Sequence, residues 1–278
     1  MKISVNTWVY GADTDIEEVF RKVNAQGYNG VEVYGRDQEV DMTDAQAARI
    51  KEMAKEYQLE LVTCCADTGL LPPDLKRNMA SMDKDTRERA IAHCIKGINH
   101  AARLGSGMVV LCVGKLEDGQ TEEQAMEMAV DSYQRLIPYA KEKNVCMIIE
   151  NFPDRWIGSA AKLKELCEKV GEPDYCKGMV DTGHELVLGN TLENAVKTLG
   201  REYMGHLHLD NNDGVIDNHD AMSNGKLTDA DFASLAAALK AIGYEGWYSF
   251  ELYGTDVGRD ADQILSDSKA CFERSMAD

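Results

Sequence analysis

Proline is scarce in this chain, and several features that mark other protein classes are missing. Only five prolines occur among 278 residues, and no Pro/Gly/Ser-rich stretch separates two halves, so we expect a single domain over residues 1–278. No apolar run reaches the length of a membrane-spanning helix, and the first residues, MKISVNTWVYG, lack the apolar core of a signal peptide. The eight cysteines show no C-x-x-C spacing, which favours buried free thiols in a cytoplasmic protein.

Basic residues are in the minority. The chain has 30 Lys and Arg against 48 Asp and Glu, giving a formal net charge of −18, and no basic cluster offsets it. Because such a field repels polyanions, nucleic acid is not an expected partner. The 44% hydrophobic content is sufficient for one large α/β domain. A small ligand, bound with the help of a metal ion, fits this charge balance.

What the chain does contain is an alternation of apolar β-prone runs and amphipathic helical patterns. Capping signals that begin at Thr14, Thr43, Asp85, Thr121 and Thr228 mark the expected helix starts. Eight units of about 35 residues each predict an α/β fold with a single (β/α)8 TIM barrel. A doubly wound sheet is the alternative, but no G-x-G-x-x-G follows the first strand. The expected strands are 3–9, 30–34, 59–64, 108–113, 145–150, 178–181, 206–209 and 247–252.

Four successive strands end in polar residues of the kind that bind metals: Glu150, Asp181, His208 and Glu251. In a barrel these strand ends meet at the active-site mouth. Three carboxylates crowded there repel one another unless they are protonated or bound to a cation. Together with one imidazole they suit Mn²⁺, Co²⁺, Mg²⁺ or Zn²⁺. Taken singly, each acid is also compatible with a helix cap or a salt bridge.

Three further residues are interpreted as structural. His93 and His100 lie on a helical stretch and are expected to be structural or surface residues. Glu32 ends its strand in GVEVY much as Glu251 does, and we expect it to make a polar contact at the mouth rather than to bind the metal.

Several stretches resemble a known superfamily, and together they span almost the whole chain: GYNGVEVYG, MIIENF, MVDTGH, GHLHLDNNDGVIDNH, NGKLTDADF and GYEGWYSFEL. They are similar to the sugar phosphate isomerase/epimerase superfamily with the xylose isomerase-like barrel, which includes ketose 3-epimerases, inosose dehydratases and the endonuclease IV group. The resemblance implies one divalent metal ion, usually Mn²⁺ or Co²⁺, on the four strand-end residues. It also implies that Glu150 and Glu251 exchange protons with the substrate, that His184 contacts a substrate oxygen, and that the chain forms a homodimer or tetramer.

The chemistry behind these roles is consistent. A metal held by a carbonyl and a neighbouring hydroxyl stabilises the enediolate charge as a Lewis acid. One glutamate removes the proton from one face, and the other returns a proton to the opposite face.

Two departures from the superfamily limit the choice of substrate. Ketose 3-epimerases carry a glutamate and an arginine where this chain has Trp156 and Gly214, which argues against the usual recognition of a free ketohexose. Asp217 and His219 match a pair that binds an additional zinc ion in the endonuclease IV branch. The ends of the third and fourth strands, however, lack that branch's histidines, which argues against a trinuclear site.

The candidate substrate contacts are Trp8, Arg155, Trp156, His184, Asp217, His219 and Tyr253. Loop structure is the alternative for Asp217 and His219, solvation for Arg155, and plain packing for the aromatic residues.

These features favour a metal-dependent epimerase or isomerase that moves protons on a sugar, polyol or sugar phosphate. A lyase or dehydratase that acts on a keto-sugar, inosose or 3-keto-glycoside by β-elimination is the alternative, since both reactions begin with the same proton removal. A non-catalytic sugar-binding barrel and an abasic-site endonuclease are less consistent with the ligand set and with the charge.

Overall fold

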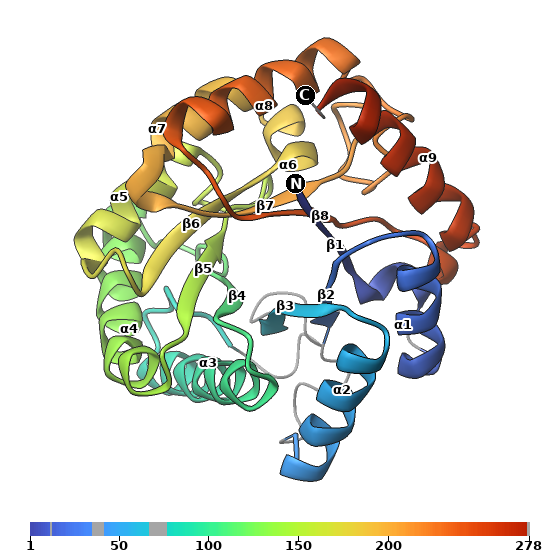
Figure 1. Ribbon diagram of the computed structural model, residues 1–278. Helices are drawn as coiled ribbons and strands as arrows, with labels where there is room; N and C mark the ends of the chain where they lie inside the picture. Colours follow the sequence, from blue (N-terminus) through green and yellow to red (C-terminus); the bar gives the residue numbers. More distant parts are fainter. Residues whose placement is uncertain (12, 35–41, 67–76, 277–278) are drawn as a thin grey trace.

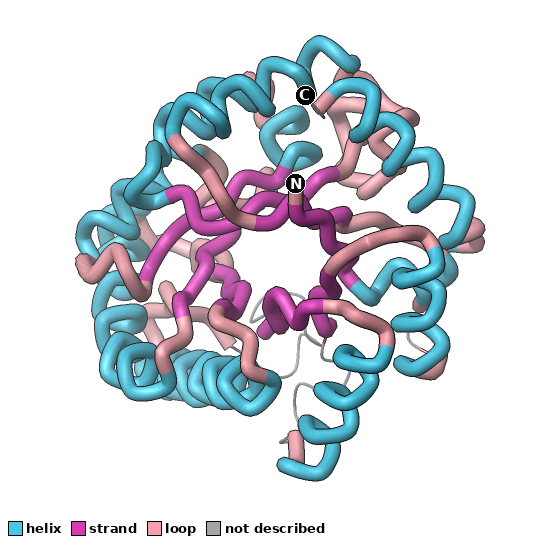
Figure 2. The backbone as a smooth tube through the Cα atoms, viewed as in Figure 1, coloured by secondary structure: helices cyan, strands magenta, loops and turns pink. Residues whose placement is uncertain are grey.

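The chain folds into a closed barrel of parallel strands surrounded by helices. The computed structural model describes residues 1–278 apart from 12, 35–41, 67–76 and 277–278. Within them, eight strands pair in the order β1 to β8 and close back on β1 (Figure 1). Figure 2 shows the strands as an inner ring with the helices around them. The predicted (β/α)8 barrel is therefore confirmed, and the doubly wound alternative is wrong.

The elements follow one another in strand–helix alternation along the chain. The strands are β1 (Lys2–Asn6), β2 (Gly30–Tyr34), β3 (Glu60–Ala66), β4 (Met108–Cys112), β5 (Cys146–Glu150), β6 (Cys176–Asp181), β7 (Met204–Leu209) and β8 (Trp247–Phe250). The helices are α1 (Ile16–Ala25), α2 (Asp44–Glu56), α3 (Lys84–Leu104), α4 (Glu122–Lys143), α5 (Ala160–Val170), α6 (Thr182–Val187), α7 (Leu192–Tyr203), α8 (Asp229–Ile242) and α9 (Ala261–Ser275), with short 3-10 helices η1 (Thr7–Tyr10) and η3 (Thr255–Val257).

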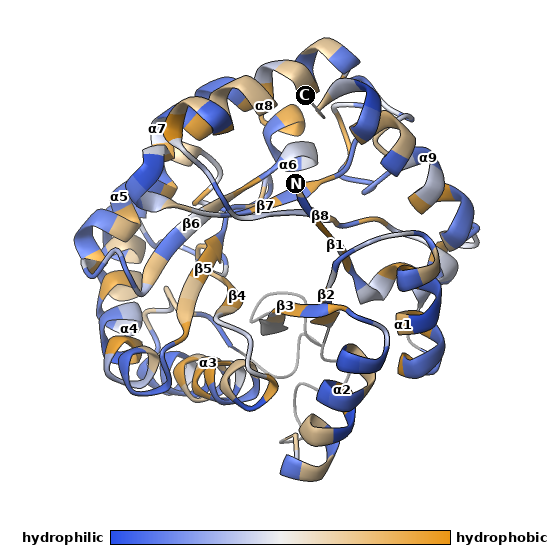
Figure 3. Ribbon diagram, viewed as in Figure 1, coloured by the Kyte–Doolittle hydropathy of each residue, from blue (hydrophilic) through white to orange (hydrophobic). Residues whose placement is uncertain are grey.

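The apolar runs of β4 and β5 explain why these segments are central strands. Both read as near-continuous apolar sequences, MVVLC and CMIIE, and are buried on both faces. Val109 and Leu111 belong to the main core. Val110, between them, belongs with Ile148 and Met179 to a separate small cluster, which alternation along the strand assigns to the barrel interior. The strong hydropathy of β5 is visible in Figure 3.

Three of the five predicted helix starts are confirmed. Thr43, Thr121 and Thr228 each cap a helix and form a capping box with the residue three positions later. The other two predicted starts are wrong. The cap of α1 is Asp15, because the Thr14 hydroxyl donates to the carbonyl of Tyr10 instead. The cap of α3 is Asp83, whose carboxylate accepts from the Thr86 backbone N–H, so the helix begins earlier than expected.

The first strand is shorter than predicted, and this correction bears on the site. It ends at Asn6 rather than at residue 9, because the Asn6 side chain accepts from the backbone N–H of Trp8 and starts η1. Asn6 therefore stands at the mouth end of β1. The ends of the other strands differ from the predicted ones by at most two residues.

The two helical histidines are structural, as predicted. His93 is buried with its Nδ1 2.6 Å from the guanidinium of Arg77. His100 accepts a hydrogen bond at Nε2 from the backbone N–H of Met42. Among the described residues, no helix combines the length and low polarity required to cross a bilayer.

Candidate active site

The four predicted ligand residues lie together at the carboxyl ends of β5 to β8. Glu150 and Asp181 are the last residues of β5 and β6, and Glu251 directly follows β8. Asp181 pairs in register with His208 of β7, which brings the carboxylate and the imidazole to the same level of the barrel. One ligand atom from each of the four lies within 4.8 Å of the others, and all four residues are buried.

The contacts of His208 show how closely these groups converge. Its Nδ1 lies 2.6 Å from Glu251 Oε2, 3.5 Å from Glu150 Oε1 and 3.8 Å from Asp181 Oδ2. Yet neither His208 Nδ1 nor Asp181 Oδ2 has a partner in hydrogen-bond geometry among the described residues, although both atoms are buried. Buried polar atoms without partners are costly. A cation between these atoms would supply the missing partner, so these acidic and histidine groups could hold a metal ion.

The electrostatics of the cluster support the same conclusion. Burial, followed by the charge of Asp210, raises the pKa of Asp181 well above its usual range. Burial also raises the pKa of Glu251, with the charge of Glu150 adding to it. For Glu150 burial acts in the same direction, but contact with His208 brings its pKa below the usual value. The carboxylates therefore compete for positive charge, which a divalent cation would supply.

A second polar group adjoins the first. Asp217 Oδ2 lies 2.8 Å from His184 Nε2 and 3.1 Å from His219 Nε2. His184 Nδ1 is 2.7 Å from the carbonyl of Asn151, and His219 Nδ1 is 3.0 Å from Asp210 Oδ2. Burial would lower the pKa of His184, but Asp181 and Asp217 raise it to about 10. Both sets, His184–Asp217–His219 and Asp181–Asp210–His219, are compact enough to hold a cation.

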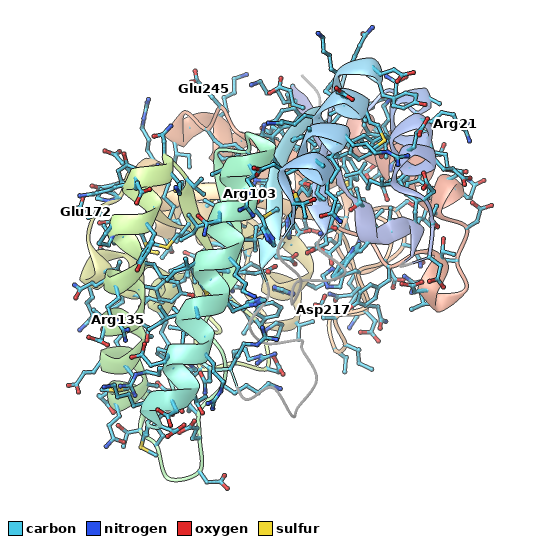
Figure 4. All side chains as sticks on the ribbon, turned by 90° about the horizontal axis from the view of Figure 1, so that it is seen from below. Arg21, Arg103, Arg135, Glu172, Asp217 and Glu245 are labelled. Carbon is cyan, nitrogen blue, oxygen red and sulfur yellow. The ribbon has the colours of Figure 1, made fainter. Side chains whose placement is uncertain are left out.

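Aromatic rings flank this second group. The rings of Trp8 and Tyr253 lie 5.4 and 4.7 Å from that of His219 and 5.2 Å from each other. Phe152 lies 4.9 Å from the ring of His184. Such rings offer apolar faces against which the C–H face of a sugar can pack. Figure 4 shows Asp217 away from Glu245, which precedes β8, as expected for a residue at the opposite end of the barrel.

Two of the predicted substrate contacts, Arg155 and Trp156, have other neighbours in the structure. Arg155 is not a freely solvated side chain: its Nε donates to Asp154 and its guanidinium lies 5.5 Å from the Phe152 ring centroid. Trp156 is buried and lines a groove with residues of α4 and α5, among them Met126 and Lys162. None of the four clustered ligands lines that groove, so the position of Trp156 gives no support to a substrate contact.

Several residues of the site were not anticipated. Asn6 donates from Nδ2 to Glu251 Oε1 at 2.8 Å. It is the last residue of β1, so the search for polar residues at strand ends would have found it if the end of β1 had been placed correctly. Asp210 follows β7 and accepts at Oδ1 from the Gly183 N–H and the Thr182 hydroxyl. Phe152 carries no chemical signal in the sequence. Glu32 makes the polar contacts expected of it, and they are with His206 and His208.

The fold and the cluster together define a barrel with a carboxylate–imidazole site at its mouth. The chain belongs to the xylose isomerase-like TIM barrel family, whose model matches residues 20–274. It is 23% identical to fructoselysine 3-epimerase of Shigella flexneri over 243 residues, 85% of each chain.

Among solved structures, D-psicose 3-epimerase in the presence of D-fructose superimposes with a TM-score of 0.81 at 19% identity, covering 100% of both chains. The 3-keto-D-glucoside 4-epimerase of E. coli gives 0.77 at 19% identity, covering 97% of this chain and 98% of the other. At this identity the structural likeness shows the fold.

Proposed function

We propose that this chain is a divalent-metal-dependent sugar epimerase or isomerase that acts by proton transfer next to a carbonyl. The observation that carries the proposal is the convergence of Glu150, Asp181, His208 and Glu251. The names of the relatives, a fructoselysine 3-epimerase and a 3-keto-D-glucoside 4-epimerase among them, support a small carbohydrate substrate. We propose Mn²⁺ as the ion. Co²⁺, Mg²⁺ and Zn²⁺ are alternatives, because mixed oxygen and imidazole donors accept all four.

The cation would be held by the four strand-end residues and would act as a Lewis acid, polarising the substrate carbonyl and stabilising the charge that follows proton removal. Glu150 and Glu251 are the proposed bases. They come from β5 and β8, with β6 and β7 between them, and so approach a substrate in the mouth from different sides. One removes a proton from one face of the carbon and the other returns a proton to the opposite face, which inverts the centre.

Neighbouring residues orient the proposed bases and the substrate. Asn6 occupies Glu251 Oε1, which leaves Oε2 on the cluster side as the oxygen that can exchange a proton. Trp8, Tyr253 and Phe152 would cover the apolar sides of the sugar ring, and His184 would donate from Nε2 to a substrate oxygen in place of its contact with Asp217. Asp217 bridges His184 and His219 and so fixes the direction in which both imidazoles point.

Elimination is the second candidate, and the environment of His184 favours it. Both ring nitrogens of His184 lie close to acceptors, the Asn151 carbonyl and Asp217, and although burial lowers the pKa of His184, the charges of Asp181 and Asp217 raise it to about 10, which favours the doubly protonated ring. An imidazolium at the mouth can protonate a leaving group and turn the same proton removal into β-elimination by a lyase or dehydratase.

Isotope exchange tests the proposal and separates the two candidates. Mn²⁺-loaded protein is incubated in D₂O with ketoses, sugar phosphates, inososes and 3-keto-glycosides, and the products are read by NMR and mass spectrometry. We expect metal-dependent deuterium incorporation with an intact carbon skeleton, abolished by EDTA. Loss of water or an aglycone would favour elimination instead.

The matched variants are Glu150→Gln and Glu142→Gln. Glu142 is an exposed glutamate of α4 that contacts Lys143. Exchange should fall by about 10²–10⁴-fold in Glu150→Gln and stay unchanged in Glu142→Gln. Unchanged turnover in Glu150→Gln, on a substrate that it binds, would mean that the proton-transfer mechanism is wrong. Cytoplasmic location and a dimeric or tetrameric state stay predictions.

A further inference from the structure

Glu32 is a buried carboxylate that contacts His208, one of the four clustered residues, across the barrel interior. It lies on β2, whereas its partners His206 and His208 lie on β7, and β1 and β8 separate the two strands around the barrel. Glu32 Oε1 is 2.6 Å from His206 Nε2, and Oε2 is 3.2 Å from His208 Nε2. At most 1% of each of these three residues is exposed. The carboxylate is therefore shielded from solvent, and the hydrogen-bond partners that the described residues provide for it are these two imidazoles.

His208 meets carboxylates on both sides, but the two contacts differ in kind. On the Glu32 side the Nε2 contact has hydrogen-bond geometry. On the cluster side Nδ1 lies closer to its nearest oxygen, Glu251 Oε2 at 2.6 Å, yet has no partner in hydrogen-bond geometry. An N–H on Nε2 would therefore donate to Glu32 in hydrogen-bond geometry, whereas an N–H on Nδ1 would have no acceptor in such geometry among the described residues.

The Glu32 side is better explained as a hydrogen-bonded pair than as a metal site of its own. Glu32, His206 and His208 are close enough to hold a cation. However, His208 has only two ring nitrogens, and Nδ1 already faces the four-residue cluster. A cation at Glu32 would require His208 to give up its proton from Nε2 as well. Both contacts of Glu32, at 2.6 and 3.2 Å, have hydrogen-bond geometry.

We propose that Glu32 is a positioning residue for the metal, which holds His208 as the tautomer protonated on Nε2 and so keeps Nδ1 free to bind the ion. The inference rests on the proposed metal site. A neutral imidazole carries one N–H, and the hydrogen bond at one nitrogen decides what the other can do. Without an acceptor at Nε2 the proton can move to Nδ1, where it would point at Glu251 and occupy the position of the ion.

His206 supports Glu32 and does not act on the ion directly. His206 donates from Nε2 to Glu32 Oε1, the oxygen that does not contact His208. The Nδ1 atom of His206 is buried and has no hydrogen-bond partner among the described residues. In a Glu32→Gln variant, the amide oxygen can still accept a hydrogen bond from His208. The amide nitrogen then faces His206, which can accept at Nε2 if its own proton is on Nδ1. The variant would then keep the shape of the site and lose mainly the negative charge that makes His208 a stronger ligand.

The test measures metal affinity directly. Mn²⁺ binding to apo protein is followed by the EPR signal of free Mn²⁺, and the ligand field is followed by the visible absorption of the Co²⁺-loaded protein. We expect Glu32→Gln to weaken Mn²⁺ binding by about 10–100-fold and to shift the Co²⁺ bands, with most of kcat recovered at saturating Mn²⁺. Glu32→Met, which offers no acceptor, should weaken binding further.

Glu185→Gln is the matched control. Glu185 is a buried glutamate of α6 that accepts from Asn151 and Asn190, so the same exchange occurs in the same kind of environment. Its Mn²⁺ affinity should remain within about twofold of wild type, because metal affinity depends on the ligands and their hydrogen-bond partners.

A measurement on the unmodified protein covers the case in which Glu32 variants do not fold. The six histidines are labelled with ¹⁵N, and the tautomers are read in the Zn²⁺-loaded protein. His208 should show a hydrogen-bonded Nε2–H and a metal-bound Nδ1. The opposite tautomer, or wild-type Mn²⁺ affinity with unchanged Co²⁺ bands in Glu32→Gln, overturns the inference alone. Failure of the wild-type protein to bind Mn²⁺ at all would instead refute the proposed metal site.

Discussion

Gly183 allows the close approach of the carboxylate that links the two halves of the site, and replacing it should show how tightly that site is built. It lies between Asp181 and His184, and its backbone N–H donates to Asp210 Oδ1 at 2.6 Å. A Cβ added to Gly183 would lie 2.8 Å from the carboxyl carbon of Asp210. Asp210 is fully buried and cannot turn into solvent.

The cost of Gly183→Ala follows from what Asp210 would have to give up. If the carboxylate moves, it weakens its bonds to the Gly183 N–H and the Thr182 hydroxyl and its contact with His219. Overpacking costs about 1–3 kcal/mol, and the loss of one hydrogen bond to a charged group costs about 1.5–3 kcal/mol. We therefore expect a loss of about 4 kcal/mol, a large part of the ~5–15 kcal/mol typical of a folded domain.

The assay is urea unfolding followed by circular dichroism, with Gly107→Ala as the control. Gly107 has no atom within 4 Å of its would-be Cβ, so that variant should stay within about 0.5 kcal/mol of wild type. In an Asp210→Ala background the cost of Gly183→Ala should fall below about 1.5 kcal/mol, since the two changes share one contact. A loss equal to that of Gly107→Ala, or one unchanged by removing Asp210, would refute the reasoning.

The remaining predictions concern the metal, the sugar and one buried thiol. Glu251→Gln should lower kcat by about 10²–10⁴-fold and lower the Mn²⁺ content after dialysis, measured by mass spectrometry; full metal content with full activity would contradict both roles. Removing Mn²⁺ present at about 100 times its dissociation constant should cost roughly 2.7 kcal/mol of stability, visible as a lower melting temperature after EDTA. Trp8→Ala should raise KM by about 2- to 13-fold, because stacking contributes roughly 0.5–1.5 kcal/mol, whereas Trp156→Phe should leave KM unchanged; equal effects would mean that Trp8 is only packing. Burial raises the pKa of Cys64 to about 12, so Cys64 should react with a thiol reagent at pH 8 only after denaturation; rapid labelling of Cys64 in the native protein, located by peptide mass spectrometry, would show that this thiol is accessible.

The convergence of Glu150, Asp181, His208 and Glu251 could be predicted because it follows from a local rule. In a parallel barrel every strand end faces the same mouth, so a polar residue after an apolar run is placed without knowledge of its neighbours. Glu150 and Asp181 are the last residues of their strands. The rule needs only the correct strand end. It missed Asn6 because VNTWV reads as one continuous strand, whereas the Asn6 side chain bonds back to Trp8 and ends the strand early.

Trp156 lies where the strand-end rule no longer applies. Six residues beyond Glu150, the chain has left the strand end, and sequence proximity no longer says which way a side chain points. A large apolar side chain there gains more from burial than from exposure at a polar mouth. The structure accordingly buries Trp156 beside α4 and α5. Arg155, one position earlier, has its guanidinium against Phe152 and Asp154.

The sequence indicates that Glu32 makes a polar contact, but it does not indicate that its partners are His206 and His208. Val110, Ile148 and Met179, on β4 to β6, fill one side of the interior with apolar side chains. On the other side, β2 and β7 contribute Glu32 and His206, which lie 174 positions apart in the sequence. No periodicity along either strand encodes that contact, because barrel closure alone brings β2 within reach of β7. The proposed role of Glu32 depends on the same closure, because Glu32 contacts His208 at Nε2, whereas Asp181 of β6 and Glu251 after β8, on the neighbouring strands, lie near Nδ1.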